Sequence, residues 1–167
     1  FKDSTIVAFS TGCVYSYVTP DSGGSTESSP VDPPGEYALS CLGREQAFVE
    51  GSSRHHTKGV LIRLNYSVEF RYGVPVDIAK KVLNDEPIDV TMGYVSLIWQ
   101  NDALNQIIQC LSLADTPPVP INITGPGVHS VRDIALRFGQ LFNKEPVLTG
   151  TEAETAWLSN ASKAHGL

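Results

Sequence analysis

The chain contains 167 residues, of which 41% are hydrophobic and 18% are charged, a composition typical of a globular domain with a real core. Its net charge of −6 at pH 7 argues against a nucleic-acid partner, because such a partner requires a basic surface. No apolar run approaches the roughly 20 residues that cross a bilayer, so we expect no membrane partner.

The three cysteines, Cys13, Cys41 and Cys110, are odd in number and far apart, and they lack the paired spacing of metal ligands. We interpret them as reduced thiols in a cytoplasmic protein without a metal site. His55 and His56 have no further ligand at a suitable spacing, so we expect them to be solvated. The chain opens on Phe without Met and closes in a pattern typical of an interrupted helix, which predicts a fragment of a longer protein.

The first third of the chain alternates strands with a helix. Residues 5–9 and 59–64 are continuous apolar, β-branched runs, which are typical of strands buried on both faces of a parallel sheet. Residues 16–35 are rich in Gly, Pro, Ser and Thr and predict a long loop. The following segment, from about 35 to 50, carries an apolar stripe at helical spacing. The order strand, helix, strand indicates an α/β fold.

The middle of the chain predicts two helices and a small pair of strands. Residues 74–83 show helical spacing. Residues 88–92 and 94–98 predict two strands paired around Gly93. A second helix would begin with Asn101 or Asp102 as its N-cap. Its expected core face consists of Ala103, Leu104, Ile107, Ile108 and Leu111.

The last third predicts one strand and two helices. Residues 119–124 predict the strand. Ser130 and Asp133 form a capping box before an apolar stripe that runs from 131 to 142. Residues 151–159 predict a last short helix.

The stretch from Glu27 to Glu45 carries the most specific pattern. It reads Glu-x-x-Pro-x-x-Pro-x-x-x-Tyr-x-x-Ser-x-x-x-x-Glu, with the tyrosine at position 37. This spacing resembles the active-site helix of the extended short-chain dehydrogenase/reductases, the NAD-dependent epimerase/dehydratase family. Thr-x-x-Val-Tyr after the first strand and Ile-Arg-Leu-Asn-Tyr at the end of the second resemble the same family, and the resemblance spans nearly the whole chain.

The resemblance implies an α/β fold class, a partial Rossmann-like parallel sheet made of the last strands with a small α+β substrate-binding part. Residues 1–66 would form the C-terminal half of a Rossmann-like NAD(P)-binding domain. Residues 67–167 would form the substrate-binding part, from which 119–124 returns as a strand of the parallel sheet. The family's glycine-rich phosphate loop belongs to an amino-terminal half that this sequence does not contain, so we expect the chain alone to bind NAD or NADP weakly.

The resemblance also implies a site. Thr11 would position the substrate oxygen, and Tyr37 would be the catalytic acid/base. The substrate would be a hydroxyl-bearing small molecule such as a sugar nucleotide, and a homodimer is expected. The expected contacts of the NAD or NADP cofactor are Tyr37, Cys41, Leu64, Asn65 and Tyr66.

Cys41 departs from the family, which has Lys at this position. The Lys binds the nicotinamide ribose and lowers the pKa of the Tyr from about 10 toward neutrality. A thiol does neither, so we expect Tyr37 to be mostly protonated near pH 7 unless Arg44, one turn further along the helix, substitutes. Cys41 itself is interpreted as a packing residue, with a redox or nucleophilic role as the alternative.

Two functions therefore stay open. One is an NAD(P)-dependent oxidoreductase or epimerase, and the other is a catalytically impaired nucleotide-binding relative with a binding or regulatory role. Dehydration is disfavoured, because the family's dehydratases place Asp-Glu where this chain has Gly12 and Cys13. The first strand would lack its usual neighbour, so we expect an open apolar edge that is liable to associate.

Overall fold

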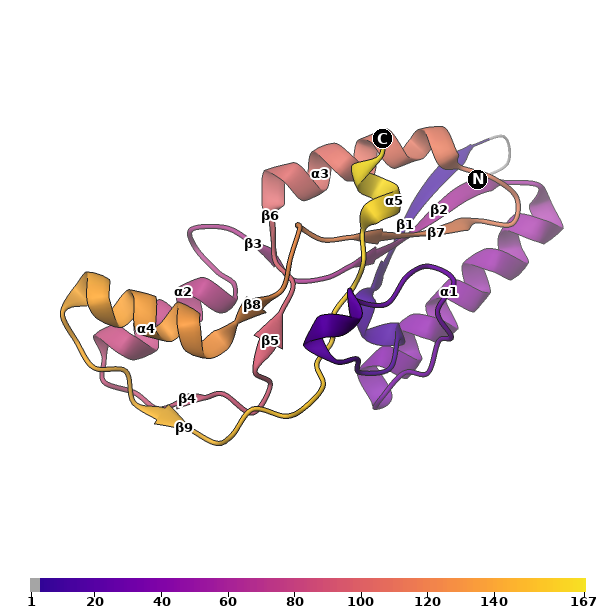
Figure 1. The fold of residues 1–167 in the computed structure, drawn as a ribbon. Helices are drawn as coiled ribbons and strands as arrows, with labels where there is room; N and C mark the ends of the chain where they lie inside the picture. Colours follow the sequence, from indigo (N-terminus) through magenta and orange to yellow (C-terminus); the bar gives the residue numbers. More distant parts are fainter. Residues whose placement is uncertain (1–3) are drawn as a thin grey trace.

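A three-stranded parallel sheet organises the molecule. The computed structural model describes residues 4–167, and Figure 1 shows their fold. The sheet has the order β1 (Thr5–Thr11), β2 (Lys58–Leu64), β7 (Val119–Ile123). Five consecutive residues of β2 are buried, which explains why its apolar run is continuous rather than alternating. Thr11 lies opposite Leu64, and Leu64 lies opposite Ile123, so the three strands end at one edge of the sheet.

Helices cover both faces of this sheet, with α1 (Glu36–His55) on one side and α3 (Gln100–Gln109) on the other (Figure 1). The α/β fold class with a parallel sheet is therefore confirmed. The predicted end of α1 near residue 50 is wrong. The helix continues through Gly51 because Ser52 is buried and its hydroxyl donates to the carbonyl of Thr57 at 2.5 Å, and it ends where His56 adopts the left-handed conformation.

The remaining elements form a second layered region and several short connections. In Figure 1 this region lies at the far end of the molecule from α1. Its core consists of apolar side chains from α2, α4 and the strands between them. The elements of the region and the connections are β3 (Ser67–Val68), α2 (Val74–Leu83), β4 (Ile88–Asp89), β5 (Tyr94–Val95), β6 (Ile98–Trp99), β8 (His129–Ser130), α4 (Val131–Phe142), β9 (Leu148–Thr149), α5 (Ser162–His165) and the 3₁₀ turns η1 (Gly12–Val14), η2 (Pro20–Ser22) and η3 (Cys110–Leu113).

Two local predictions about this part of the chain are confirmed. Residues 74–83 form a helix as expected. The capping box also forms, because Ser130 Oγ accepts a hydrogen bond from the N–H of Asp133 at 3.1 Å.

The predicted strand pair around Gly93 is wrong. β4 pairs with β9 in parallel, and β5 pairs with β8 antiparallel. The carbonyl of Gly93 accepts a hydrogen bond from the N–H of Val131, so the chain at Gly93 connects to the start of α4 and does not close a hairpin. The helix predicted over 151–159 is also wrong, because this segment runs beside the loop 16–35 and bridges it at Ala156 and Ser159.

The predicted core face of α3 is only partly correct. The helix begins at Gln100 with Trp99 at the N-cap position, so neither Asn101 nor Asp102 is the cap. Ala103 and Ile107 are buried against the sheet. The other three expected core residues are 45%, 65% and 41% exposed: Leu104, Ile108 and Leu111. The sheet formed by the described residues has only three strands. It covers the side of α3 that carries Ala103 and Ile107 and leaves the other three side chains exposed.

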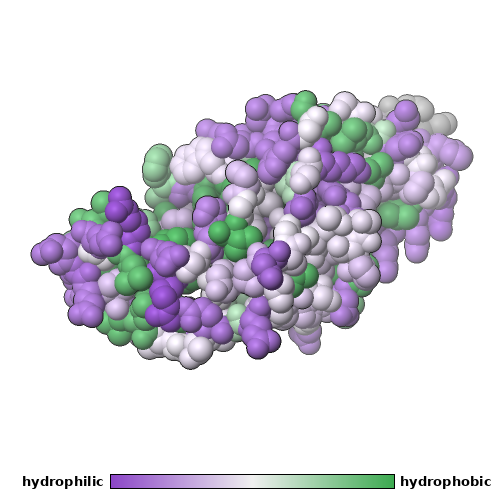
Figure 2. All heavy atoms as spheres, in the orientation of Figure 1, coloured by the Kyte–Doolittle hydropathy of each residue, from purple (hydrophilic) through white to green (hydrophobic). Residues whose placement is uncertain are grey.

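Exposed leucines also occur at the opposite end of the molecule. Leu83, Leu136 and Leu141 on α2 and α4 are exposed, and Figure 2 shows green atoms among the purple surface there. Within residues 4–167, no helix combines the length and the apolar character that crossing a bilayer requires.

A buried ion pair ties α1 to the sheet. The Arg63 guanidinium donates to both carboxylate oxygens of Glu45, at 2.9 and 2.7 Å, and both side chains are less than 10% exposed. Ser10 Oγ donates to the same carboxylate at 2.5 Å. Arg63 also donates to the Tyr15 hydroxyl at 2.8 Å, and that hydroxyl donates to Asn122 Oδ1 at 2.9 Å. The network therefore joins β1, the residue that follows η1, α1, β2 and β7.

Removing the charge of Glu45 should destabilise the fold. In Glu45→Gln the side chain keeps its shape, but Arg63 stays buried without an anion, so we expect a loss of about 3–5 kcal/mol in the free energy of unfolding. Urea denaturation measures this loss. The control Glu50→Gln changes an exposed position on the same helix and should stay within about 0.5 kcal/mol. A loss below about 1 kcal/mol in Glu45→Gln would contradict the role of the pair.

The free edge of β1 should promote association. Among the described residues β1 pairs only with β2, and Phe9 on β1 is 49% exposed. We expect the chain to elute in size-exclusion chromatography ahead of an 18.0 kDa monomer, and Phe9→Lys to shift it toward the monomer, because charged residues block edge pairing. Phe70→Lys, at an 88% exposed position outside the sheet, is the control. A clean monomer of the unmodified chain would contradict this expectation.

Candidate functional site

Thr11 lies at the carboxyl end of β1, where open α/β sheets bind their ligands. Its side chain is buried, and Oγ1 accepts a hydrogen bond from the N–H of Cys13 at 3.2 Å. This bond caps η1, which turns the chain away from the sheet directly after the strand. The predicted position of Thr11 at a strand end is thus as the sequence indicated.

Tyr37 reaches the same place from the first turn of α1. Its ring is 66% exposed. Partial burial and the Cys41 thiol raise the pKa of the Tyr37 phenol, the charge of Cys13 raises it further, and a hydrogen bond with the Thr11 side chain lowers it, with a net shift upward. The Thr11 side chain, which comes from another element, is thus among the groups that influence the pKa of Tyr37. The shift is opposite to the one a general base needs near pH 7.

Cys41 is buried one turn after Tyr37. It packs against Val14 and Tyr15, and Arg44 Nη2 donates to its sulfur at 3.5 Å. The positively charged guanidinium of Arg44 therefore lies next to the Cys41 thiol. A thiol is shorter than a Lys side chain and lacks its three N–H donors, which could bind a ribose. The buried Cys41 therefore does not fit a cofactor-binding role.

The three predicted cofactor contacts after β2 take different positions. Leu64 is half-buried and packs against the core of the sheet. Asn65 is buried, and its amide donates to the carbonyl of Trp157 at 3.3 Å and to Ser159 Oγ at 3.4 Å. Tyr66 has a φ of 37° and packs against the second core, which α2, α4 and the strands between them form.

A feature that the sequence did not indicate is the segment that covers this end of the sheet. Val18 and Ser25 of the long loop bridge Ala156 and Ser159, and the Tyr17 ring lies 4.8 Å from that of Trp157. Asn122 of β7 donates to the carbonyls of Ser25 and Asn160, at 2.9 and 3.0 Å. These contacts hold the loop 16–35 at this end of the sheet. They join residues that are nearly 100 or more positions apart in the sequence.

Gly24 permits this close approach. Its φ of 85° suits glycine, and a Cβ there would lie 2.7 Å from the backbone of Ser159. Gly12 is similarly enclosed, because a Cβ would lie 2.8 Å from Ser159 Oγ and 3.3 Å from the Asn65 side chain.

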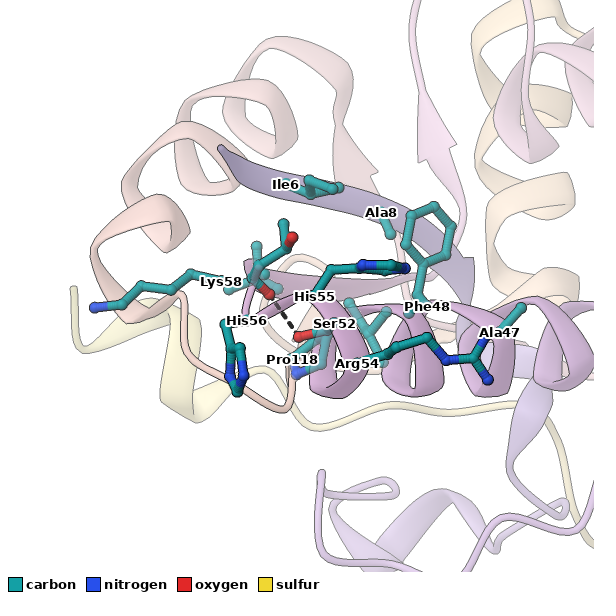
Figure 3. Close-up of a pocket in the computed structure, with 15 residues that line it drawn as sticks. Ile6, Ala8, Ala47, Phe48, Ser52, Arg54, His55, His56, Lys58 and Pro118 are labelled. Carbon is teal, nitrogen blue, oxygen red and sulfur yellow. Dashed lines mark hydrogen bonds between the residues drawn. The ribbon is translucent and has the colours of Figure 1, made fainter. Parts of the chain in front are cut away.

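A cavity of about 630 Å³ lies at the other end of β1 from Thr11. In Figure 3 Ile6 and Ala8 of β1 face Phe48 and His55 of α1 across it. It does not coincide with the Thr11–Tyr37 site. Its lining comes from the second half of α1 and from the first residues of β1 and β2, so it lies between the helix and the strands, away from Thr11.

A second cavity of about 230 Å³ adjoins Tyr66. It is lined by α2, β4, β5 and the start of α4, and Asp77 and Lys81 stand among its polar residues. Within residues 4–167, no group of three or more His, Cys, Asp or Glu side chains has the arrangement of a metal site.

No protein-family model matches the chain, and no curated protein sequence matches it significantly. Solved structures do match. UDP-glucuronic acid 4-epimerase from Bacillus cereus, in complex with UDP-glucuronic acid and NAD, aligns with a TM-score of 0.81 and 19% identity over 98% of this chain. UDP-glucose 4-epimerase from Thermus thermophilus, in complex with NAD, aligns with a TM-score of 0.78 and 17% identity over 98% of this chain.

A dTDP-glucose 4,6-dehydratase from Streptomyces venezuelae, also with NAD bound, aligns with a TM-score of 0.79 and 16% identity over 97% of this chain. The chain spans only about half of these structures, 55%, 57% and 53% of their respective lengths. The fold that the resemblance implied is therefore confirmed: the chain has the fold of a carboxyl-terminal part of the NAD-dependent sugar-nucleotide epimerases and dehydratases, the extended short-chain dehydrogenase/reductases.

Proposed function

We propose that the protein is an NAD(P)-dependent oxidoreductase or epimerase that acts on a hydroxyl-bearing small molecule such as a sugar nucleotide. The observation that carries the proposal is the position of Thr11 at the carboxyl end of a parallel sheet, beside the start of α1, which carries Tyr37 and packs through Cys41 on the residues that follow Thr11. The fold shared with sugar-nucleotide epimerases supports it, and so does the presence of NAD in those structures.

In this proposal Thr11 positions the substrate and Tyr37 transfers the proton. The buried Thr11 hydroxyl holds the substrate oxygen. The exposed phenol of Tyr37 exchanges a proton with the substrate hydroxyl, as an acid when protonated and as a base when ionised. With an ordinary pKa near 10, only about one phenol in a thousand is ionised at pH 7, and the raised pKa of Tyr37 makes that fraction smaller.

The cofactor would be NAD or NADP, which would exchange hydride with the substrate carbon. Of the proposed contacts, Tyr37 faces the site, but Cys41 and Asn65 are already occupied by protein contacts. Tyr37 thus fits the part of such a site that faces the substrate. Cys41 and Asn65 do not fit the part that would hold the ribose of the cofactor. We therefore assign no step to the cofactor.

A second candidate is a catalytically impaired relative that binds a nucleotide and has a binding or regulatory role. The specific observation that favours it is the burial of Cys41 at the position of the family's Lys, together with the raised pKa of Tyr37. Dehydration remains disfavoured. Gly12, at the position of the dehydratases' Asp, is enclosed by Ser159 and Asn65, which leaves no room for a carboxylate.

The proposal includes an organisation for the whole protein. Residues 1–66 would belong to a cofactor-binding domain and residues 67–167 to a substrate-binding part, from which 119–124 returns as a strand of the parallel sheet. A homodimer in the cytoplasm would be the working form.

Replacing Cys41 by Lys should lower the pKa of Tyr37 by about 1 to 3 pH units, because an ammonium would replace a thiol beside the phenol. Ultraviolet titration of tyrosinate absorbance, with Tyr37→Phe subtracted to isolate this residue, measures the change. Gly43→Lys adds the same charge at an exposed position where a Cβ meets nothing within 4 Å, and it should leave Tyr37 unchanged. An unchanged Tyr37 pKa in both variants would contradict the placement of Cys41.

Turnover of the full-length protein separates the two candidates. Over a panel of sugar nucleotides with NAD or NADP, the enzyme hypothesis predicts activity that rises with pH toward 10 and falls at least 100-fold in Tyr37→Phe. Tyr72→Phe, at an exposed tyrosine that bonds Gln100, is the control and should retain activity. Cofactor binding without turnover, together with turnover gained in Cys41→Lys, would contradict the enzyme hypothesis and support the impaired relative.

A further inference from the structure

The larger cavity of the molecule has the features of a binding site in its own right. It opens between the carboxyl-terminal half of α1 and the first residues of β1 and β2, at the opposite end of the sheet from Thr11 (Figure 3). Its volume of about 630 Å³ lies in the range of cavities that hold small molecules. It is therefore large enough for a ligand, and it is separate from the site proposed for Thr11 and Tyr37.

Small residues on facing elements leave this space open. One face of α1 lines the cavity at helical spacing, with Ala47, Phe48, Gly51, Ser52 and His55. At Gly51 an added Cβ would meet no atom within 4 Å, so the helix leaves room there. On the opposite wall Ala8 of β1 is buried and is also small. The empty volume thus follows from the side chains that the sequence places at these positions.

The walls of the cavity are mainly apolar. The apolar lining includes Ile6, Ala8, Phe48, Val60, Leu61 and Pro118. Polar groups beside these residues are paired within the protein. The Ser52 hydroxyl donates to the carbonyl of Thr57 at 2.5 Å, and the N–H of Gly59 donates to the carbonyl of Asp115 at 2.9 Å. The body of a ligand that fits this space should therefore be a hydrocarbon.

The rim of the cavity is basic. Its exposed residues include Arg54, His55, His56 and Lys58, and no Asp or Glu occurs among the lining residues that the structure describes. The ion pairs formed within residues 4–167 involve neither Arg54 nor Lys58. Part of this charge offsets the negative end of the α1 dipole. In a chain whose net charge is −6, the basic rim nevertheless favours a ligand with an anionic head.

We propose that this cavity binds an anionic amphiphile, a carboxylate with a hydrocarbon chain such as a fatty acid. The hydrocarbon chain lies between α1 and the strands, against Ile6 and Phe48. The carboxylate stays at the rim, near the charges of Arg54 and Lys58 and in contact with water. Binding removes the apolar walls and the hydrocarbon chain from water without burying the charged head. The site is independent of the proposed activity.

The first test is a calorimetric titration of the 167-residue chain with decanoate, and ¹H–¹⁵N correlation spectra locate the site. We expect saturable binding, with chemical-shift changes at the amides of Ala8, Gly51 and Leu61 and none at Thr11. Decan-1-ol has the same hydrocarbon chain without the charge, so it should bind about three to ten times more weakly.

A pair of glycine variants tests the cavity itself. Gly51→Leu places a side chain in the space that the ligand would occupy, so it should weaken decanoate binding by about tenfold or more. Gly43→Leu is the matched control. Gly43 is also a glycine of α1 where an added Cβ meets no atom within 4 Å, but it does not line the cavity, so the affinity should stay unchanged. Both replacements favour the helix, so a loss of binding would not result from unfolding.

A second pair of variants tests the basic rim. The double variant Arg54→Gln and Lys58→Gln should weaken decanoate binding by about three- to tenfold and leave the binding of decan-1-ol unchanged. The double variant Lys80→Gln and Lys81→Gln removes the same charge from α2 and should alter neither affinity.

The absence of saturable decanoate binding would overturn the proposal, and so would chemical-shift changes centred on Thr11 or on α2 and α4. Equal affinity in Gly51→Leu, or equal affinity for decanoate and decan-1-ol, would do the same. Binding that disappears in Phe9→Lys would assign the cavity to a contact between two copies of the chain, against the proposal. Because these measurements need no nucleotide and no turnover, their result is independent of the proposed function.

Discussion

The structure depends on one buried charge pair. Arg63 in the central strand and Glu45 in α1 meet with two hydrogen bonds at 2.9 and 2.7 Å, and their side chains are only 8% and 5% exposed. Burial acts to lower the pKa of Arg63, but the hydrogen bonds and charges of Glu45 and Tyr15 more than offset it, so its pKa rises above the ordinary value. A pair of this kind is costly to break, because one charge would stay buried alone. It therefore fixes the rotation of α1 about its axis.

That rotation determines what the site contains. Tyr37, Cys41 and Glu45 follow one another at four-residue intervals, so the helix face that buries Glu45 also turns Cys41 into the core. Tyr37, at the exposed start of the same face, is left at the end of β1 beside Thr11. The fixed helix thus positions the phenol, and the same geometry buries a thiol where a charged amine would activate it. The position of Tyr37 and the pKa of its phenol are therefore separate properties of this structure.

Much of this arrangement was predictable from the sequence, and the failures have a common cause. The runs at β1 and β2, the stripe of α2 and the spacing around Tyr37 are local patterns, and the elements they predict are present. The errors concern long-range contacts. Gly93 connects to α4, the segment 151–159 bridges the loop 16–35, and the three-stranded sheet formed within residues 4–167 leaves the outer side of α3 exposed. Cys41 was visible in the sequence, but its burial against Val14 depends on how α1 packs against η1. No local pattern reports that packing.

The central claim is spatial, since the proposed function requires the Tyr37 ring and the Thr11 side chain to meet at the end of the sheet. Nuclear Overhauser effects between the Tyr37 ring protons and the Thr11 side chain test it directly, with assignments checked by Tyr37→Phe and Thr11→Val. The account predicts clear cross-peaks between these two groups at neutral pH. Their absence, in a sample that shows the expected cross-peaks between Cys41 and Val14 in the adjoining core, would contradict it.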